Sequence, residues 1–249
     1  MKLELLKSHL QDIPHMRLPQ AEEITRIILD NHYHDILELG FCHGVSTCYM
    51  AGALEELGQG QITTIDLESA KNFEPAIETL LHDLNLSSWV NVCYEPTSYT
   101  WRLMHMLQQN PIPQFDFCYI DGAHNWFVDG FAFFLVDRLL KPGGLIVFDD
   151  LNWTYDTSPS LKKTDFVKNM PDDERCTPQV RKVYELLVKT HPNYGEFLDK
   201  DGWAYARKLN QNEFDQISTV RREVVYEKEY VGFLPYVQKK IRRIARKFQ

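Results

Sequence analysis

The feature that most constrains this chain is a regular alternation of short apolar runs and longer amphipathic segments between residues 19 and 150. The apolar runs suit buried strands and occupy 35–40, 61–67, 90–94, 115–121 and 144–149. Segments with helical periodicity precede or separate them, at 19–31, 46–57, 74–84, 99–109 and 126–140. Connections of that length join parallel strands through crossover helices, so the pattern predicts a mostly parallel sheet with helices on both faces.

The rhythm breaks after residue 150. Residues 151–177 are rich in Asp, Thr, Ser, Lys and Pro, which predicts a long mobile insertion that acts as a lid. A helix at 178–190 and two short strands, at 195–200 and 202–208, would then close the sheet as an antiparallel edge hairpin. The expected fold class is α/β: a Rossmann-like, doubly wound, mostly parallel seven-stranded sheet with an antiparallel edge hairpin and helices on both faces.

Composition limits the class of protein further. With 249 residues, 44% of them hydrophobic and 25% charged, the chain suits one globular domain over 1–210, with an N-terminal helical cap over 1–33. No transmembrane segment is expected, because no stretch approaches the roughly 20 apolar residues that would span a bilayer, and the polar opening is not a signal peptide. We therefore expect a cytoplasmic protein, and a homo-oligomer. Five cysteines without CxxC spacing are interpreted as reduced thiols.

The charge is distributed unevenly along the chain. The formal net charge is −8, but residues 239–247 carry six cations and no acid, so the rest of the chain carries −14. A body this acidic would repel a phosphate backbone, which argues against nucleic acid as a partner. The predicted C-terminal helical extension, 211–249, ends in a short basic amphipathic helix. Three roles stay open for it: a clamp on an acidic patch of the same or a neighbouring subunit, a weak contact with a membrane surface, or a solvated end.

Polar side chains follow four of the predicted parallel strands. In an open α/β sheet, ligands bind outside the carboxyl ends of the strands, so these positions are the candidate site. Glycines follow the first strand at Gly40 and Gly44, where the backbone can turn sharply and approach a ligand. Asp66 ends the second strand, where a carboxylate can accept hydrogen bonds from a ribose. The fourth and fifth strands end in the sequences 121–124 (DGAH) and 149–150 (DD).

These motifs resemble those of the class I S-adenosylmethionine-dependent methyltransferases, over roughly residues 20–208. The segment 38–46 (ELGFCHGVS) is similar to the glycine-containing first motif in the form found in small-molecule O-methyltransferases, without the middle glycine of the commoner form. Residues 140–150 (LKPGGLIVFDD) and 120–124 (IDGAH) are similar to the fifth and fourth strands of the metal-dependent branch, which includes catechol, caffeoyl-CoA and macrocin O-methyltransferases.

The resemblance implies a role for each matching position. S-adenosylmethionine would be bound by Glu38, Gly40, Gly44, Ser46, Asp66, Thr97, Ser98 and Asp121. A divalent cation, Mg²⁺ or a similar ion, would be held by Asp121, Asp149 and Asp150. Converging carboxylates repel one another unless a cation offsets them, and oxygen ligands favour a hard ion, so the acidic trio supports the metal site independently. The predicted catalytic residues are Asp121 and His124, the latter as the general base.

The predicted function is methyl transfer to a hydroxyl of a small molecule, such as a sugar, polyketide or phenol. Two alternatives stay open: a non-catalytic interaction protein that keeps the fold, and a metal-independent methyltransferase. A nicotinamide-dependent dehydrogenase is a weaker third, because Gly40 and Gly44 do not form its G-x-G-x-x-G fingerprint. Trp126, Trp153 and Tyr155 would wall an acceptor pocket or simply pack.

Overall fold

The computed structural model describes residues 2–210 and 213. The chain divides into a compact unit, residues 1–208, and a second unit, residues 209–249. The predicted basic amphipathic helix of the tail lies outside the described residues, so the three roles considered for it stay predictions. Among the described residues, no helix has both the length and the apolar character needed to cross a membrane.

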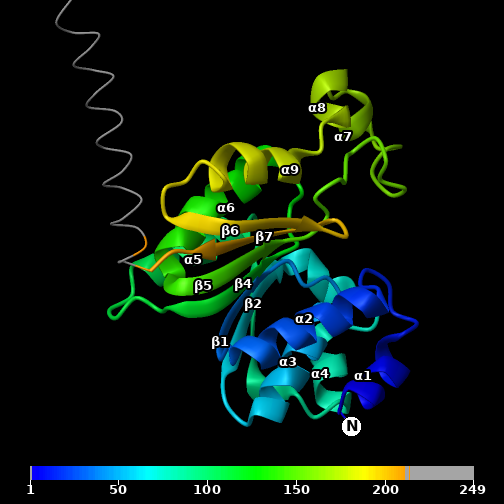
Figure 1. Ribbon diagram of the computed structural model, residues 1–249. Helices are drawn as coiled ribbons and strands as arrows, with labels where there is room; N and C mark the ends of the chain where they lie inside the picture. Colours follow the sequence, from blue (N-terminus) through cyan, green and yellow to red (C-terminus); the bar gives the residue numbers. More distant parts are fainter. Residues whose placement is uncertain (1, 211–212, 214–249) are drawn as a thin grey trace, which may run out of the picture. The chain divides into compact units, whose positions relative to one another are not determined.

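One seven-stranded sheet organises the first unit (Figure 1). Its strands are β1 (Asp35–Leu39), β2 (Gln61–Leu67), β3 (Val90–Glu95), β4 (Phe115–Ile120), β5 (Leu140–Phe148), β6 (Tyr194–Lys200) and β7 (Trp203–Lys208). They are ordered β3-β2-β1-β4-β5-β7-β6. The pairs among β1 to β5 are parallel, whereas β7 is antiparallel to both β5 and β6. The predicted fold class is confirmed, including the antiparallel hairpin at the edge.

Helices cover both faces of the sheet. On one face lie α1 (Lys2–Leu10), α2 (Leu18–Asn31), α3 (Val45–Leu57) and α4 (Ile77–Asp83), whose apolar side chains form one core cluster with the sheet. On the other lie α5 (Tyr99–Leu107), α6 (Trp126–Leu139) and α9 (Gln179–Val183), which continues as a π-helical turn over Tyr184–Val188. Short 3₁₀ turns at Glu68–Asn72 and Ser87–Trp89 flank α4. Two cores on opposite faces of one sheet are what a doubly wound fold requires.

The strand order sets the position of the site. β1 lies between β2 and β4. From β1 the chain adds β2 and β3 on one side, then crosses to the other side of β1 and adds β4 and β5 there. The carboxyl ends of β1, β2, β4 and β5 therefore meet at one edge, at the point where the strand order reverses.

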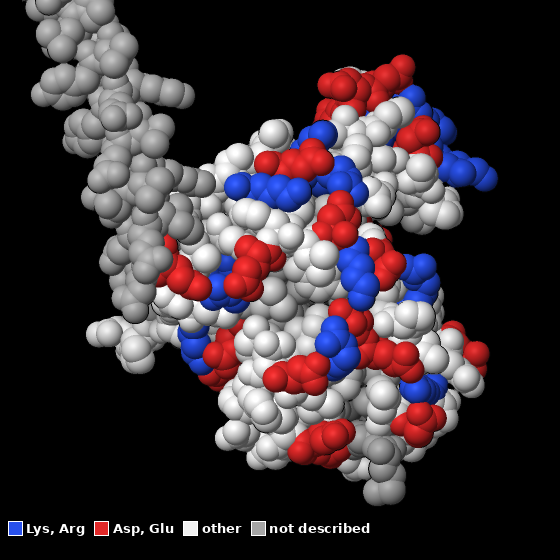
Figure 2. Space-filling view, viewed as in Figure 1, with Lys and Arg blue, Asp and Glu red and all other residues white. Residues whose placement is uncertain are grey.

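Residues 151–177 differ from the prediction of a structureless insertion. They contain α7 (Asp165–Lys168) and α8 (Asp172–Cys176), and the Thr164 hydroxyl accepts the Val167 amide at the start of α7. Val167 is fully buried, so the segment has an apolar anchor of its own. Figure 2 shows acidic and basic side chains clustered on the part of the surface that the 151–177 segment forms. Polar composition could not reveal helices as short as four and five residues.

Candidate active site

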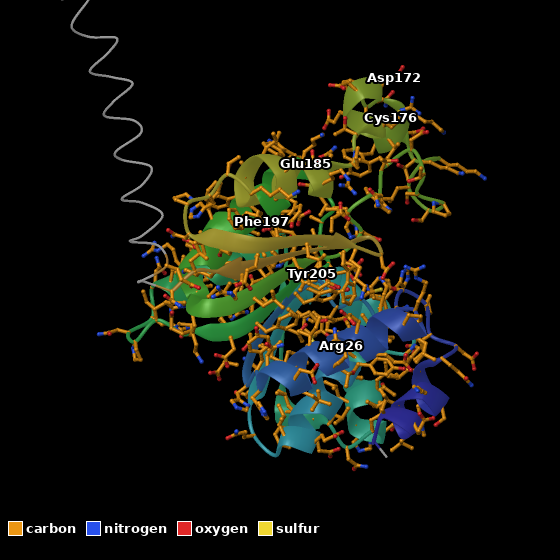
Figure 3. All side chains as sticks on the ribbon, in the orientation of Figure 1. Arg26, Asp172, Cys176, Glu185, Phe197 and Tyr205 are labelled. Carbon is orange, nitrogen blue, oxygen red and sulfur yellow. The ribbon has the colours of Figure 1, made fainter. Side chains whose placement is uncertain are left out.

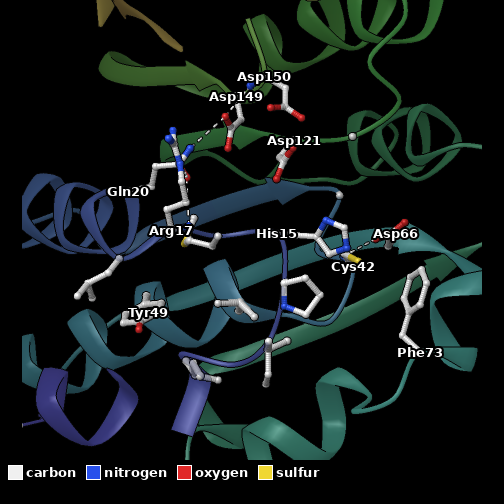
Figure 4. A pocket seen from close by; sticks show the side chains of 18 of the residues that line it. His15, Arg17, Gln20, Cys42, Tyr49, Asp66, Phe73, Asp121, Asp149 and Asp150 are labelled. Carbon is white, nitrogen blue, oxygen red and sulfur yellow. Dashed lines mark hydrogen bonds between the residues drawn. The ribbon is translucent and has the colours of Figure 1, made fainter. Parts of the chain in front are cut away.

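A cavity of about 1030 Å³ lies at the carboxyl ends of the parallel strands (Figure 4). The turn after β1 contributes Gly40 and Cys42, and the end of β2 contributes Asp66. The ends of β4 and β5 contribute Asp121, Gly122, His124, Asp149 and Asp150. The structure therefore brings three of the predicted cofactor residues, Gly40, Asp66 and Asp121, to the same cavity as the predicted metal ligands Asp121, Asp149 and Asp150.

Backbone hydrogen bonds between strands fix the start of each site segment. The Gly40 amide donates to the carbonyl of Ile65 at 2.8 Å, the Asp121 amide to that of Leu39 at 2.9 Å, and the Asp149 amide to that of Ile120 at 2.9 Å. Each site residue is thus the first residue beyond a strand, still bound to the neighbouring strand. Sites built on rigid elements hold their geometry better than sites on free loops.

Gly40 allows two of these strand ends to approach closely. Its φ is +86°, and a Cβ built there would lie 2.1 Å from the carbonyl oxygen of Asp121. A side chain at this position would push the β1 turn away from the end of β4, so the position requires glycine.

The turn after β1 is held from both sides by carboxylates. Asp66 accepts hydrogen bonds from the amides of Phe41 and Cys42 at 2.9 and 2.8 Å. On the buried side, Glu38 accepts from three hydroxyls, those of Ser46, Thr47 and Thr64, at 2.5 to 2.6 Å. Burial raises the pKa of Glu38 to about 7, although these three hydrogen bonds act to lower it.

Several predicted cofactor residues therefore lie behind the cavity wall. Glu38 and Ser46 are buried and do not line the cavity. Ser98 caps α5 by accepting the amide of Thr100, Thr97 is exposed, and neither lines the cavity. Their proposed contacts with the cofactor stay predictions.

At the other end of the cavity, Asp121, Asp150 and His124 converge. Their ligand atoms lie within 4.8 Å of one another, and a ring nitrogen of His124 lies 3.2 Å from Asp121 and 3.4 Å from Asp150. Among the described residues, His124 is the only basic side chain within ion-pair distance of Asp121 and Asp150. Burial acts to lower the pKa of His124, but the hydrogen bond and charge of Asp121, with the charge of Asp150, raise it to about 9.

Asp149 lies beside this group and has different partners. Its carboxylate accepts hydrogen bonds from the hydroxyl of Tyr119 and from the backbone amide of Asp150. It also accepts a longer one, at 3.5 Å, from the side-chain amide of Gln20. Burial and the neighbouring charge of Asp121 raise its pKa. Asp150 has its pKa raised by the same two causes. We use the name carboxylate cluster for Asp121, Asp149 and Asp150.

The N-terminal segment covers the cavity, whereas the sequence predicted a helical cap over 1–33 without assigning any of its residues to the site. Between α1 and α2, the residues Ile13 to Arg17 line the cavity, as do Leu10 before them and Gln20 after them. Figure 4 shows Arg17 and Gln20 near Asp149. The only sequence signal was a short polar segment, 11–17, between two helical ones. No residue of 151–177 lines the cavity.

The aromatic residues predicted as pocket walls have other contacts. Trp153 packs against His124, with ring centroids 5.0 Å apart, and against Tyr155 at 4.9 Å. Trp126 lies at the start of α6 and is 40% exposed. The 151–177 segment thus reaches the carboxylate cluster through Trp153 and His124, and its role as a lid stays a prediction.

Residues 37–151 match the family model described as a methyltransferase domain. The chain is similar to the structure of an O-methyltransferase from Bacillus cereus in complex with SAH (20% identity, 83% of this chain and 90% of that chain, TM-score 0.60). It is also similar to the O-methyltransferase TomG from Streptomyces achromogenes in complex with SAM (20%, 84% and 90%, 0.59). A third similar structure is a putative caffeoyl-CoA O-methyltransferase from Staphylococcus aureus (22%, 84% and 92%, 0.58).

The comparison with curated proteins gives no match. The similarity to the three structures is at the level of the fold, and the domain match covers all the strand ends that form the cavity. Residues 37–151 thus match a methyltransferase domain, and the chain shares the fold of these O-methyltransferase structures, which agrees with the resemblance found in the sequence.

Proposed function

We propose that the protein transfers the methyl group of S-adenosylmethionine to a hydroxyl of a small molecule, such as a sugar, polyketide or phenol, with the help of a divalent cation. The observation that carries this proposal is that one cavity joins the glycine turn to the carboxylate cluster. A methyl donor bound at the glycine turn and an acceptor oxygen bound at the carboxylate cluster would face each other inside this cavity. Similar structures hold SAH or SAM, which supports the choice of cofactor.

The cofactor would lie along the turn after β1. Gly40 keeps this part of the wall free of side-chain atoms, and Asp66 lines the wall next to it. Both oxygens of Asp66 accept backbone amides, and a carboxylate oxygen has a further lone pair with which to accept a ribose hydroxyl. Glu38 and Ser46 would act from behind, by fixing the shape of the turn.

The carboxylate cluster fits a divalent cation. Asp121 and Asp150 converge there with Asp149 beside them, and burial and mutual repulsion raise the pKa of Asp149 and Asp150. Among the described residues only His124 lies within ion-pair distance of them, and the charges of His15 and Arg17 act more weakly to lower the pKa of Asp150. A cation held by Asp121 and Asp150, with Asp149 beside them, would lower the pKa of an acceptor hydroxyl and orient it. His124 brings a nitrogen ligand to the group, which also suits Mn²⁺.

The chain's own residues would position the reactants and move the proton. His124 lies at the cluster and is the proposed acceptor of the hydroxyl proton. This role requires the bound cation to offset Asp121 and Asp150, whose charges otherwise raise the pKa of His124 to about 9 and keep its ring protonated. Trp153 holds its ring from one side. The N-terminal segment would exclude water from the cavity, and Arg17 would face the acceptor. Positioning of this kind contributes much of the rate in displacement reactions.

One observation favours a metal-independent methyltransferase as the second candidate. The ring of His124 already lies within 3.4 Å of both Asp121 and Asp150, so its positive charge can offset theirs without an added ion. In that case His124 would be a fixed part of the wall.

Calorimetry with S-adenosylhomocysteine and a turnover assay with Mg²⁺ or excess chelator test these proposals together. We expect binding of one S-adenosylhomocysteine per chain, and turnover that chelator and Asp150→Asn both abolish. Asp30→Asn, at an exposed acid of α2, is the matched control. Undiminished turnover in chelator would select the metal-independent enzyme, and absence of nucleoside binding would favour a non-catalytic interaction protein.

The remaining predictions on partners rest on the sequence alone. A homo-oligomer, a cytoplasmic location and a weak membrane contact of the basic tail stay predictions.

A further inference from the structure

A second group of metal-ligand side chains lies at the edge of the same cavity. His15, Cys42 and His43 each offer one ligand atom, and these three atoms lie within 4.8 Å of one another. His15 comes from the loop between α1 and α2, whereas Cys42 and His43 belong to the turn after β1. Figure 4 shows His15 beside Cys42. The fold thus brings His15 next to Cys42 and His43, which lie 27 and 28 positions later in the sequence. Each of the two segments contributes one imidazole, and the turn after β1 also contributes the thiol.

We propose that His15, Cys42 and His43 form a binding site for one thiophilic divalent cation of the zinc type, with a ligand set distinct from the carboxylate cluster. Two imidazoles and a thiolate are ligands that Zn²⁺ prefers, whereas Mg²⁺ prefers oxygen. Binding of the ion would release the thiol proton of Cys42 to solvent. This site does not depend on the proposed function, because its binding can be measured without any methyl transfer.

The hydrogen bond of His43 independently points to a metal ligand. Its Nδ1 lies 2.9 Å from the carbonyl oxygen of Pro75, so Nδ1 carries the proton and donates it there. Nε2 is then left with a free lone pair. Ligating histidines in zinc sites commonly donate their other ring N–H to a carbonyl or carboxylate, which fixes the tautomer and the ring direction. Phe73 packs on the same ring, with centroids 5.0 Å apart, and further restricts its orientation.

The rings of His15 and His43 are already arranged side by side. They are stacked with an interplanar angle of 16° and centroids 6.0 Å apart. In a tetrahedral zinc site with bond lengths of about 2.1 to 2.3 Å, ligand atoms lie about 3.5 Å apart. Ligand atoms within 4.8 Å therefore need to close by about an ångström. His15 is exposed and lies on a loop, so it can make most of that movement.

Three protein ligands leave a fourth position of a tetrahedral ion open. Structural zinc sites use four protein ligands, and sites with three keep a position for water or another ligand. His15 and Cys42 line the cavity, so this open position would face the space assigned to the cofactor. A bound ion would also connect the N-terminal segment to the turn after β1 and so hold the cover of the cavity in place.

Co²⁺ titration of the full chain, followed by absorption, tests the site. Co²⁺ takes the same ligands as Zn²⁺, and a cobalt–thiolate bond gives a charge-transfer band in the near ultraviolet that carboxylate sites cannot give. We expect this band to saturate at one Co²⁺ per chain and to disappear when Zn²⁺ is added. Cys42→Ser should abolish it, and His15→Gln should weaken Co²⁺ affinity at least about tenfold. Asp121→Asn should leave it intact.

Cys176→Ser is the matched control for the thiol. Cys176 is exposed on α8 (Figure 3), away from the cavity lining, and its replacement should leave the band unchanged. Absence of a thiolate band in the wild type, or a band that survives Cys42→Ser, would overturn the proposal. His15→Gln keeps the test decisive if Cys42→Ser does not fold, because His15 is exposed and outside the core. A band with unchanged affinity in His15→Gln would remove His15 from the site.

Limited proteolysis tests the connection between the two segments. Arg17 is exposed and lies two residues after His15, so trypsin cleavage after Arg17 reports on this loop. Zn²⁺ should slow that cleavage about tenfold in the wild type and leave it unchanged in His15→Gln, which also controls for any effect of Zn²⁺ on trypsin. Equal slowing in both proteins would contradict the proposed connection.

Discussion

Glu38, a fully buried acid, and the carboxylate cluster, whose acids range from buried to half-buried, lie at neighbouring strand ends and differ in what surrounds them. Burial raises the pKa in both, to about 7 for Glu38 and upward for Asp149 and Asp150. Glu38 is surrounded by three hydroxyl donors, and charged neighbours cause only the smaller part of the rise in its pKa. Asp149 and Asp150 have Asp121 as a neighbour, whose charge raises their pKa further.

This difference separates a structural carboxyl group from the proposed set of cation ligands. An acid with its lone pairs occupied by hydroxyls holds the backbone and needs no ion. Acids whose main neighbours are other acids are destabilised unless a cation is bound. Glu38 lies near the end of an apolar strand, β1, and the cluster acids directly follow two others, β4 and β5, so the sequence pattern alone does not tell the two sets apart.

The largest expected difference between the two sets is in turnover. Asp121→Asn should lower kcat by about a thousandfold, or about 4 kcal/mol of barrier, because it removes a ligand of the proposed cation. Glu38→Gln should cost about tenfold, since Glu38 acts on the cavity only through the turn that it holds. Steady-state kinetics at saturating cofactor measures both, and Glu56→Gln, on the exposed face of α3, is the control. Equal losses in the two variants would show that the comparison is wrong.

The pH dependence of stability should include a contribution from Glu38. Its pKa rises from 4.5 in the unfolded chain to about 7 in the folded one, so the unfolded state ionises first as pH increases. The stabilisation is complete below about pH 4.5 and is lost progressively as pH rises to about 7, by about 3 kcal/mol in total. Glu38→Gln should reduce this slope to the part that Asp149 and Asp150 contribute, because their pKa values are raised as well, and Glu56→Gln should keep the full slope, in urea denaturation at a series of pH values. An unchanged slope in Glu38→Gln would place the titrating group elsewhere.

Addition of a divalent cation should act on the other set alone. At a Mg²⁺ concentration of about 100 times Kd, the free energy of unfolding should rise by about 2.7 kcal/mol, because the ion binds only the folded state. Asp121→Asn and Asp150→Asn should lose this stabilisation, whereas Glu38→Gln should keep it. Thermal unfolding with and without Mg²⁺ gives the measurement, and a shift that persists in Asp150→Asn would argue against the cluster as its site.

The sequence predicted the strand ends well because the signal is local. Short apolar runs define β1 to β5, and β2 has the predicted bounds, Gln61–Leu67. β5 begins earlier than predicted, at Leu140, because Leu140 pairs with Phe115 across a register shift that no local pattern reveals. Asp121, Asp149 and Asp150 were predicted to lie together, since residues that follow neighbouring parallel strands meet at one edge.

The residues that the sequence missed depend on tertiary position. His15, Arg17 and Gln20 line the cavity because the loop between α1 and α2 folds over the sheet edge, and nothing in their spacing indicates this. The structure likewise turns Asp66 toward the backbone of the β1 turn, where the sequence suggested only a ribose ligand. Local periodicity carries no information on which loop covers a cavity or on where a side chain finds its partner.

The smallest expected effects come from single hydroxyl donors, one in each set. The Ser46 hydroxyl donates to Glu38 and the Tyr119 hydroxyl to Asp149, so Ser46→Ala and Tyr119→Phe each remove one hydrogen bond and should each cost about 1 kcal/mol of stability. Their effects on the cation should differ. The Tyr119 hydroxyl lowers the pKa of Asp149, so its loss favours the protonated carboxyl and should weaken Mg²⁺ affinity about tenfold at neutral pH. Ser46→Ala should leave Mg²⁺ affinity unchanged in calorimetry, because Glu38 accepts its hydrogen bonds behind the wall; an equal weakening in both variants would mean that Glu38 and the cluster act as one coupled set of charges.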